Sequence, residues 1–233
     1  MKALITGASK GIGWAIAQKL ASKNFDLVLN ARNIQELEAC KDQLLEKYPS
    51  IIITCIASDL STKAGVFALS DPILNSEETL DILINNAGVF LPGILAEEPE
   101  GTLEKMVETN LYSAYYLTKA LLPKLLKSEQ PHIFNMCSIA SKIAYPNGGS
   151  YSISKFALLG FNKVLREELK DKGVKVTAIL PGATWSNSWA GVDLPRARLM
   201  EASDIAIAVS SAIDMSPSAV VEEIIVRPQL GDL

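Results

Sequence analysis

Short apolar runs alternate with segments of helical periodicity along the whole chain of 233 residues. The apolar runs predict strands at residues 2–6, 26–30, 51–56, 80–84, 132–136, 174–180 and 220–226. Between them, apolar residues recur every three or four positions and predict helices at residues 12–20, 34–48, 64–74, 100–127, 150–172 and 204–213. Because nearly every residue of each predicted strand is apolar, helices should cover both faces of the sheet. The alternation therefore predicts an α/β fold with a doubly wound, seven-stranded parallel sheet and right-handed crossovers.

No linker divides the chain into two domains. Hydrophobic residues make up 48% of the composition and charged residues 21%, the range of one compact globular domain. We therefore expect a single domain over residues 1–233. One long stretch of weak periodicity covers about residues 182–200, directly after a predicted strand. Because a loop at the carboxyl end of a strand is often functional in such folds, this stretch is expected to be a substrate loop.

The composition disfavours several kinds of chemistry. Three widely spaced cysteines without a CxxC pair indicate neither a disulfide framework nor a zinc site, and they suit a reducing compartment. The single histidine, His132, precludes a multi-histidine metal site and is expected to be a solvated residue at the sheet edge. The net charge of -4 disfavours nucleic acid as a partner.

Signals of membrane insertion or export are not found in the sequence. No apolar run approaches the roughly 18–20 residues that span a bilayer. Only a few residues separate Met1 from Gly7, where a glycine-rich turn begins, so no signal peptide is expected. The sequence predicts a cytoplasmic protein that binds no membrane and no nucleic acid.

A glycine-rich turn follows the first predicted strand and opens the first helix. It reads Thr-Gly-Ala-Ser-Lys-Gly-Ile-Gly over residues 6–13. Glycines at this place let the backbone turn tightly and approach a pyrophosphate, whose charge the helix N-terminus favours. The turn therefore predicts a dinucleotide site that includes Gly7, Ser9, Lys10, Gly11, Ile12 and Gly13.

A tyrosine and a lysine stand four residues apart in the helix predicted at 150–172. Tyr151 and Lys155 should share one face of that helix, which brings an ammonium close to a phenol. The phenol has an ordinary pKa of about 10, and a nearby cation stabilises the phenolate and lowers that pKa. Ser138 follows the strand predicted at 132–136 and so lies at the sheet edge where α/β folds bind ligands. We therefore expect a tyrosine activated by a lysine, with a serine hydroxyl addressing the same substrate oxygen.

Taken in order, the motifs resemble those of the short-chain dehydrogenase/reductase family over essentially the whole chain. The resemblance rests on TGxxxGxG at residues 6–13, Asp59, Asn-Asn-Ala-Gly at residues 85–88, Asn110, Ser138, Tyr151-x-x-x-Lys155 and Pro181-Gly182. It implies a Rossmann-type three-layer sandwich and an oxidoreductase that transfers hydride between a nicotinamide and a ketone, aldehyde or alcohol. A dinucleotide-binding regulatory protein without turnover is the alternative class, although such a protein is expected to lack the tyrosine or the lysine.

The resemblance also implies roles for these residues. Tyr151 would be the general acid in reduction and the base in oxidation, while Ser138 would orient the substrate and stabilise an oxyanion. Lys155 would modify the pKa of the tyrosine and bind the nicotinamide ribose, and Asn110 would hold a water that leads to Lys155. The other implied cofactor contacts are Asp59 at the adenine, Asn86, Ala87 and Gly88 beside the adenine ribose, and Pro181, Gly182, Thr184 and Ser186 near the nicotinamide.

The end of the second predicted strand narrows the choice of cofactor. Enzymes specific for NAD carry a carboxylate there to bind the ribose 2′-hydroxyl, whereas this chain has Ala31 followed by Arg32. An arginine suits a 2′-phosphate through charge-assisted hydrogen bonds, and Lys10 is a second cation within reach. The sequence therefore predicts NADP(H) as the cofactor.

The C-terminal residues 220–232 resemble the branch of the family that includes sepiapterin reductase-like and small carbonyl reductases. This implies an NADPH-dependent reductase of a small-molecule ketone or aldehyde, with 3-oxoacyl-(acyl-carrier-protein) reduction as the alternative activity. The helices predicted at 100–127 and 150–172 resemble the oligomer faces of the family and imply a homodimer or homotetramer.

Overall fold

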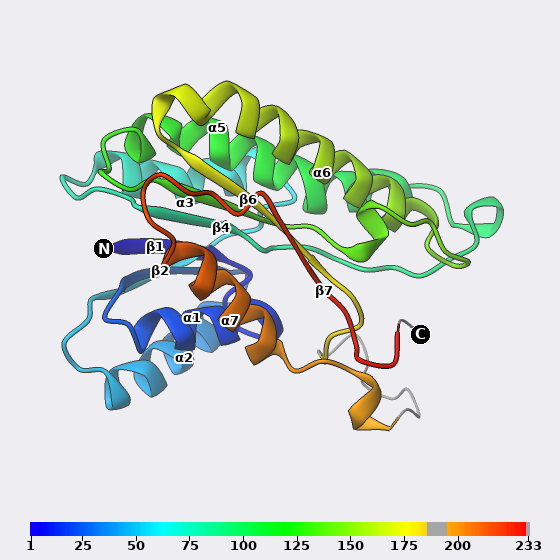
Figure 1. The fold of residues 1–233 in the computed structure, drawn as a ribbon, viewed down its shortest axis with the longest axis horizontal. Helices are drawn as coiled ribbons and strands as arrows, with labels where there is room; N and C mark the ends of the chain where they lie inside the picture. The colour runs from blue at the N-terminus through cyan, green and yellow to red at the C-terminus, as the bar shows by residue number, and fades with distance from the viewer. Residues whose placement is uncertain (186–194, 232–233) are drawn as a thin grey trace.

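A parallel sheet forms the centre of the computed structural model, which describes residues 1–185 and 195–231 (Figure 1). Its strands in the described residues are β1 (Lys2–Thr6), β2 (Asp26–Ala31), β3 (Ile53–Ala57), β4 (Ile82–Asn85), β5 (His132–Met136), β6 (Lys175–Pro181) and β7 (Glu223–Val226). They lie in the order β3-β2-β1-β4-β5-β6-β7, and every neighbouring pair is parallel. The direction of winding reverses between β1 and β4, and ligands bind at the carboxyl ends of the strands beside such a reversal.

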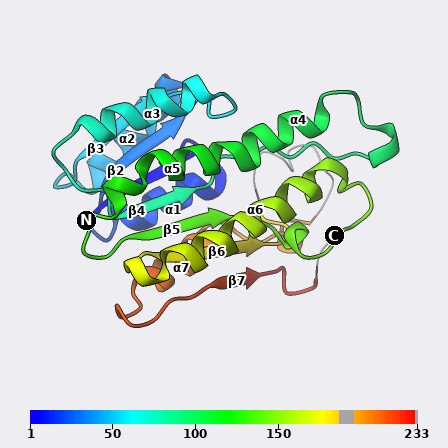
Figure 2. The same cartoon turned by 90° about the horizontal axis from the view of Figure 1, so that it is seen from above.

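Helices cover both faces of this sheet and make three layers, as the two views in Figures 1 and 2 show. One face carries α1 (Gly11–Ala21), α2 (Ile34–Lys47) and α7 (Ala202–Ile213). The other face carries α3 (Lys63–Asn75), α5 (Ser113–Leu125) and α6 (Gly149–Leu169). The arrangement confirms the predicted Rossmann-type, doubly wound sandwich with a seven-stranded parallel sheet.

Successive residues of the central strands belong to two different cores. In β1, Ile5 packs into the core beneath α1, α2 and α7, whereas Leu4 packs into the core beneath α3 and α5. In β4, Ile84 packs into the same core as Ile5, and Leu83 packs into the same core as Leu4. Because neighbouring side chains of a strand point to opposite faces, a strand covered on both sides needs apolar residues at every position. Each such Leu or Ile contributes about 1.5–3 kcal/mol when it is fully buried.

The helix predicted at residues 100–127 is interrupted. It consists of α4 (Thr102–Val107), a π-helical turn over Glu108–Tyr112, and α5. A π turn contains one more residue than an α turn, and such turns occur frequently at functional sites. The break falls on Asn110, a predicted site residue, which is buried in the middle of the turn. The predicted helix is thus helical from Thr102 to Leu125 with a π turn inside it, and apolar spacing does not reveal the one extra residue of that turn.

Other boundaries differ from the predictions by a few residues. The helix predicted at 150–172 ends as α6 at Leu169 and continues into a short 3-10 turn over Lys170–Lys172. The last strand was predicted from residue 220 but starts at Glu223. It pairs only with β6 among the described strands, from Ala178↔Glu223 to Pro181↔Val226, so β6 sets its length.

His132 is buried, which corrects the prediction of a solvated histidine at the sheet edge. It is the first residue of β5, a strand flanked on both sides by β4 and β6, and only 2% of it is exposed. Its Nε2 lies 2.7 Å from Thr177 Oγ1, and its ring stacks on Phe134 with 3.9 Å between centroids. Burial lowers the pKa of His132 to about 3, so the ring is neutral at physiological pH.

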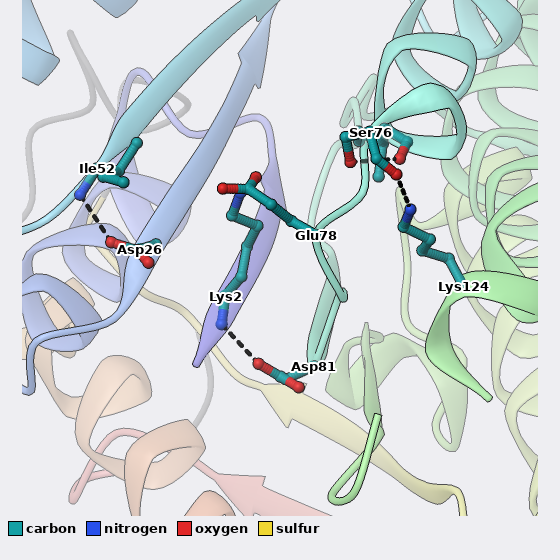
Figure 3. Close-up of polar contacts among 8 residues, drawn as sticks. Lys2, Asp26, Ile52, Ser76, Glu78, Asp81 and Lys124 are labelled. Atoms are coloured by element: carbon teal, nitrogen blue, oxygen red, sulfur yellow. Dashed lines mark hydrogen bonds and ion pairs between the residues drawn. The ribbon is translucent and has the colours of Figure 1, made fainter. Parts of the chain in front are cut away.

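Polar contacts fasten the amino-terminal edge of the sheet (Figure 3). The Lys2 backbone N–H donates to Asp81 Oδ2 at 2.7 Å, and the Lys2 ammonium pairs with Glu78. The Ile52 N–H donates to Asp26 Oδ1 at 2.7 Å. Lys124 of α5 donates to the carbonyl oxygen of Ser76, the residue that follows α3. These charged groups therefore hold the edge opposite to the carboxyl ends of the strands.

No helix in residues 1–185 and 195–231 is long and apolar enough to cross a membrane. Within the same ranges, no three or more His, Cys, Asp or Glu side chains gather as metal ligands would. The three cysteines are free thiols, with Cys40 and Cys137 buried and Cys55 half-buried.

Candidate active site

The turn after β1 is shaped by two glycines. Gly7 has φ +63°, a left-handed conformation that other residues rarely adopt. A Cβ on Gly13 would lie 2.2 Å from the Gly7 carbonyl oxygen, so only glycine lets the start of α1 pack against the turn. Lys10, the N-cap residue of α1, makes no side-chain hydrogen bond to the helix. The N-terminus of α1 is therefore available to an anion, as a pyrophosphate site requires.

The segment after β4 is fastened directly to this turn. The Thr6 hydroxyl accepts hydrogen bonds from the backbone N–H groups of Asn86 and Ala87, both at 2.9 Å. The Asn86 side chain donates to the carbonyl oxygens of Thr6 at 2.9 Å and Gly7 at 3.2 Å. The predicted cofactor residues of β1 and β4 are thus held as one unit across the point where the strand order reverses.

A buried amide network lies beneath this unit. The Asn85 side chain donates to Thr118 Oγ1 and to Asn135 Oδ1, both at 2.9 Å, and Asn135 donates to Asn162 Oδ1 at 2.8 Å. The network ties β4 and β5 to α5 and α6, so Asn85 braces the central strands. Sequence reasoning missed Asn135 and Asn162, although an asparagine inside the apolar strand 132–136 is a signal of a buried polar contact.

Ser138, Tyr151 and Lys155 meet at the carboxyl end of β5. Ser138 follows the strand by two residues, and its hydroxyl lies close enough to the Tyr151 phenol to lower the pKa of that phenol. Tyr151 lies in the first turn of α6, and the Lys155 Nζ one turn later is 5.8 Å from the centroid of the Tyr151 ring. The Lys155 ammonium donates to the Met136 carbonyl oxygen at 2.7 Å. The structure therefore brings the three residues together as their spacing predicted.

The pKa of Tyr151 differs from the prediction. Burial raises the pKa of Tyr151 above its usual value, and the nearby Ser138 hydroxyl offsets only part of this effect. Burial also lowers the pKa of Lys155 to about 8. The lysine was predicted to lower the pKa of the phenol, but desolvation is the largest effect on that pKa and leaves it raised. In this structure the phenol is therefore protonated at neutral pH.

Ser138 is held in place by a reciprocal pair of hydrogen bonds. Its hydroxyl accepts from the Ala140 N–H, and its own N–H donates to Ser141 Oγ, each at 3.1 Å. This capping arrangement opens the short helical turn Ile139–Ser141. Sequence reasoning missed Ser141, although the Ser-x-x-Ser spacing is typical of such a cap. The arrangement fixes the rotamer of the hydroxyl that faces Tyr151.

Glu98 holds the start of α6, next to Tyr151. Its Oε1 accepts from the Ser150 backbone N–H at 2.9 Å, and its other oxygen accepts from the Ser150 hydroxyl. A carboxylate at a helix N-terminus is favourable because it faces unpaired N–H groups. Glu98 was not identified in the sequence, because it lies far along the chain from the helix that it caps.

Asn110 joins the π turn to the catalytic helix. Its side chain accepts from the Val89 N–H at 2.7 Å and donates to the Val89 carbonyl oxygen at 3.0 Å. It also donates to Ser154 Oγ at 2.9 Å, directly beside Lys155 in the chain. The structure thus places Asn110 next to the catalytic group, and its predicted role in holding a water stays a prediction.

A cavity of about 500 Å³ opens over these groups. The predicted residues that line it are Ile12, Asn86, Gly88, Ser138, Tyr151, Lys155, Pro181, Gly182 and Thr184. Its apolar wall includes Phe90, whose ring meets the Tyr151 ring at 4.8 Å between centroids. Sequence reasoning missed the wall residues Phe90, Ile139, Ile143, Tyr145 and Arg227. They lie on loops or, for Ile139, in a short helical turn, and neither carries a periodic signal.

The remaining predicted cofactor residues continue along the carboxyl edge of the sheet. Arg32 follows β2 directly and is exposed, and Asp59 follows β3 by two residues. The Asp59 carboxylate accepts from the Ser61 N–H at 3.0 Å and so forms a turn, and its predicted adenine contact stays a prediction. With the strand order β3-β2-β1-β4-β5-β6, the predicted adenine, phosphate and nicotinamide contacts follow one another along one edge.

The nicotinamide end is held by backbone hydrogen bonds. The Gly182 N–H donates to the Val226 carbonyl oxygen at 2.8 Å, and Thr184 Oγ1 donates to the Gly182 carbonyl oxygen at 3.0 Å. Thr184 also forms a bridge to Met200. The prediction for Ser186 lies outside the described residues.

The comparisons with known proteins agree with this geometry. The family model described as short chain dehydrogenase matches residues 1–194. The sepiapterin reductase of Chlorobaculum tepidum is 35% identical over an alignment of 238 positions, which covers 99% of this chain and 97% of that protein. A 3-oxoacyl-(acyl-carrier-protein) reductase of Haemophilus influenzae is 31% identical over 218 residues, which cover 89% of this chain and 88% of that protein.

Solved structures show the same fold. The alcohol dehydrogenase of Thermococcus sibiricus complexed with 5-hydroxy-NADP superposes with a TM-score of 0.90 at 28% identity, covering 98% of this chain and 96% of that one. A metagenomic short-chain oxidoreductase in complex with NADP superposes with a TM-score of 0.84 at 30% identity, covering 98% and 97% of the two chains. Together with the site geometry, these matches show that the chain belongs to the short-chain dehydrogenase family and is an oxidoreductase.

Proposed function

We propose that this protein is an NADP(H)-dependent reductase of small ketones or aldehydes. The observation that carries the proposal is the contact of Ser138, Tyr151 and Lys155 at one end of a cavity that also reaches the predicted nicotinamide contacts. A regulatory protein without turnover needs none of these groups, and their joint burial has a cost in desolvation that turnover explains.

The residues present fit NADP(H). Gly13 lets the start of α1 pack closely against the glycine turn, so the N-terminus of α1 opens directly after that turn, where a pyrophosphate would bind. At the end of β2, Ala31 leaves no carboxylate to repel a 2′-phosphate, while Arg32 and Lys10 supply cations. The relatives solved with NADP support the same choice. When bound, NADPH supplies the hydride that reduces the carbonyl carbon.

Tyr151 supplies the proton in this proposal. Its raised pKa keeps the phenol protonated at neutral pH, so Tyr151 donates its proton to the carbonyl oxygen as hydride reaches the carbon. The Ser138 hydroxyl contacts the same phenol and orients the substrate oxygen. The Lys155 ammonium, with a pKa of about 8, carries positive charge at neutral pH and favours the phenolate that proton transfer leaves.

The cavity favours a compact substrate with an apolar or aromatic body. Phe90, Ile139, Ile143 and Tyr145 supply most of the wall beside Tyr151. A substrate of the kind reduced by sepiapterin reductases or small carbonyl reductases suits this wall. We also propose that the predicted substrate loop of residues 182–200, of which 186–194 lie outside the described residues, begins at the cavity with Gly182, and that the chain is a single catalytic domain in the cytoplasm.

A substrate panel tests the proposal directly. Pterin, steroid, sugar, small-ketone and acyl-thioester carbonyl compounds are each assayed for oxidation of NADPH by the wild-type protein and by Tyr151→Phe. We expect turnover of a compact ketone or aldehyde, and a loss of about a thousandfold in Tyr151→Phe because the general acid is gone. Equilibrium binding of NADPH should change little in that variant.

Tyr116→Phe, on α5 outside the cavity, serves as the matched control and should retain activity. Undiminished turnover in Tyr151→Phe would refute the mechanism. Turnover of acyl thioesters alone would support the 3-oxoacyl alternative, and no turnover of any compound would support the regulatory alternative.

We further propose that the outer faces of α5 and α6 form a homodimer or homotetramer interface. Large apolar side chains are exposed there, including Tyr115, Phe156 and Val164, and Tyr112 of the adjoining π turn is exposed as well. The two helices lie side by side on the outer layer of the molecule (Figure 2). Burying these side chains against a second copy removes apolar surface from water.

A further inference from the structure

The Glu36 carboxylate occupies two of the donors that the cofactor site offers. Its Oε1 accepts from the Lys10 ammonium at 2.7 Å, and its Oε2 accepts from the Ser9 hydroxyl at 3.1 Å. Ser9 and Lys10 belong to the glycine turn and are both predicted cofactor contacts. One carboxylate of α2 therefore binds the same pair of groups that a phosphate would need.

The local fold places Glu36 there. Since β1 and β2 are adjacent and parallel, with Thr6 opposite Asn30, the turn after β1 lies beside the start of α2. The Asn33 side chain caps α2 by accepting from the N–H groups of Gln35 at 2.9 Å and Glu36 at 3.2 Å. The carboxylate thus stands in the first helical turn, where the helix dipole favours negative charge.

The surrounding charges stabilise Glu36 as an anion. Its hydrogen bond with Lys10 holds the pKa of the Glu36 carboxyl below its usual value, and the charge of Arg32 acts in the same direction. Lys10 and Arg32 are also the two cations that suit a 2′-phosphate. With Glu36 ionised among them, the cluster carries one positive charge rather than two.

We propose that Glu36 is a specificity-determining residue that competes with the 2′-phosphate of NADP(H) for Lys10 and Ser9, and so limits the preference for NADP(H) over NAD(H). This inference rests on the proposed NADP(H) binding. A bound 2′-phosphate must displace the carboxylate from Lys10 and then lies close to a like charge. NAD(H) has no phosphate at this position, so its affinity does not depend on that displacement.

The test measures equilibrium dissociation constants of the whole protein by titration calorimetry. The probes are NADPH, NADH, adenosine 2′,5′-bisphosphate and ADP. In Glu36→Gln we expect about tenfold tighter binding of NADPH and of the 2′,5′-bisphosphate, because a unit charge beside a phosphate dianion is removed. The affinities for NADH and ADP should stay within about twofold of the wild-type values.

Glu38→Gln is the matched control. Glu38 lies on the same helix and pairs with Lys41 at 3.4 Å, so removing its charge should leave all four constants unchanged. In a Lys10→Met background, Glu36→Gln should tighten NADPH binding by less than it does in the wild-type background, because the shared partner is gone.

Each outcome bears on one proposal. Unchanged or weaker NADPH binding in Glu36→Gln would overturn the inference and show that the carboxylate only anchors the turn. Equal tightening of NADPH and NADH would overturn it as well. A wild-type protein that binds NADH as tightly as NADPH would refute the proposed cofactor preference, whereas a preference for NADPH that appears only in Glu36→Gln would support the competition.

Discussion

At the scale of single residues, desolvation dominates the electrostatics of the site. Lys155 is buried and Tyr151 is half-buried, and desolvation shifts the pKa of each toward the neutral form of the side chain. At neutral pH the tyrosine is therefore protonated and can act as an acid. The lysine is charged at that pH, although its pKa of about 8 lies close to it. This balance suits reduction, in which the phenol must give up a proton.

The pH dependence of reduction should report Lys155. Its pKa of about 8 means that the ammonium is charged below that pH and neutral above it. We expect kcat/KM for reduction to be level near neutrality and to fall by about tenfold per pH unit above about pH 8, because the phenolate loses its cation. Steady-state kinetics over this range measure the profile. In Lys155→Arg, whose side chain stays charged, the decline should shift to higher pH, and an unshifted profile would assign it to another group.

Single residues also show which contacts can be predicted from the sequence and which cannot. Tyr151 and Lys155 could be paired because they are local, four positions apart in a helix of clear periodicity. Glu98 and Ser150 are joined across 52 positions, and Glu36 and Lys10 across 26, so no local pattern reveals either contact. The sequence also did not reveal that the pKa of Tyr151 is raised, because this shift depends on how far the fold removes the phenol from water.

At the scale of elements, β5 contributes both to the stability of the fold and to the support of the candidate site. The strand begins at the buried His132 and ends two residues before Ser138, and its Asn135 belongs to the amide network under the cavity. The π turn at Asn110 has a similar role on the helical side, where it connects Val89 to Ser154. Both elements place polar groups in otherwise apolar surroundings.

His132 should make the protein sensitive to acid. Burial lowers the pKa of His132 from its ordinary value of 6.5 to about 3 in the folded protein. Because the unfolded chain takes up the proton first, stability is complete above about pH 6.5 and is lost as the pH falls toward 3. Between about pH 7 and about pH 4.5 the free energy of unfolding should fall by about 2 kcal/mol through this residue. Urea denaturation at the two values measures the loss.

His132→Asn is the comparison for this prediction. It removes the titrating ring and should reduce the acid-induced loss, whatever its effect on stability at neutral pH. An identical loss in the variant and the wild type would show that carboxyl groups, rather than His132, account for the acid sensitivity.

At the scale of the whole molecule, the sheet separates two tasks. The amino-terminal edge is held by ion pairs and hydrogen bonds such as those of Lys2 and Lys124 (Figure 3). The carboxyl edge carries, in order, the glycine turn after β1, the segment after β4, and the cluster of Ser138, Tyr151 and Lys155. Binding residues can therefore lie on loops while rigid strands keep them in register.

The assembly prediction belongs to this scale. Phe156, which is 45% exposed on α6, should be buried in the proposed interface. Light scattering of the wild-type protein at micromolar concentration should give a dimer or a tetramer, and Phe156→Glu should give a smaller species because it places a charge in an apolar contact. Ile52→Glu, at a residue that is 57% exposed near the amino-terminal edge, is the control and should keep the wild-type mass. A wild-type monomer would contradict the proposal.

The sequence by itself determined the layered, doubly wound fold and pointed to Ser138, Tyr151 and Lys155 as one cluster, because these depend on period, local spacing and position after a strand. Only the tertiary structure decided that His132 is buried, that Asn110 lies in a π turn, and that Glu36 binds Lys10. The reason is physical: burial and charge pairing depend on distances between segments far apart in the chain, and local pattern does not encode those distances.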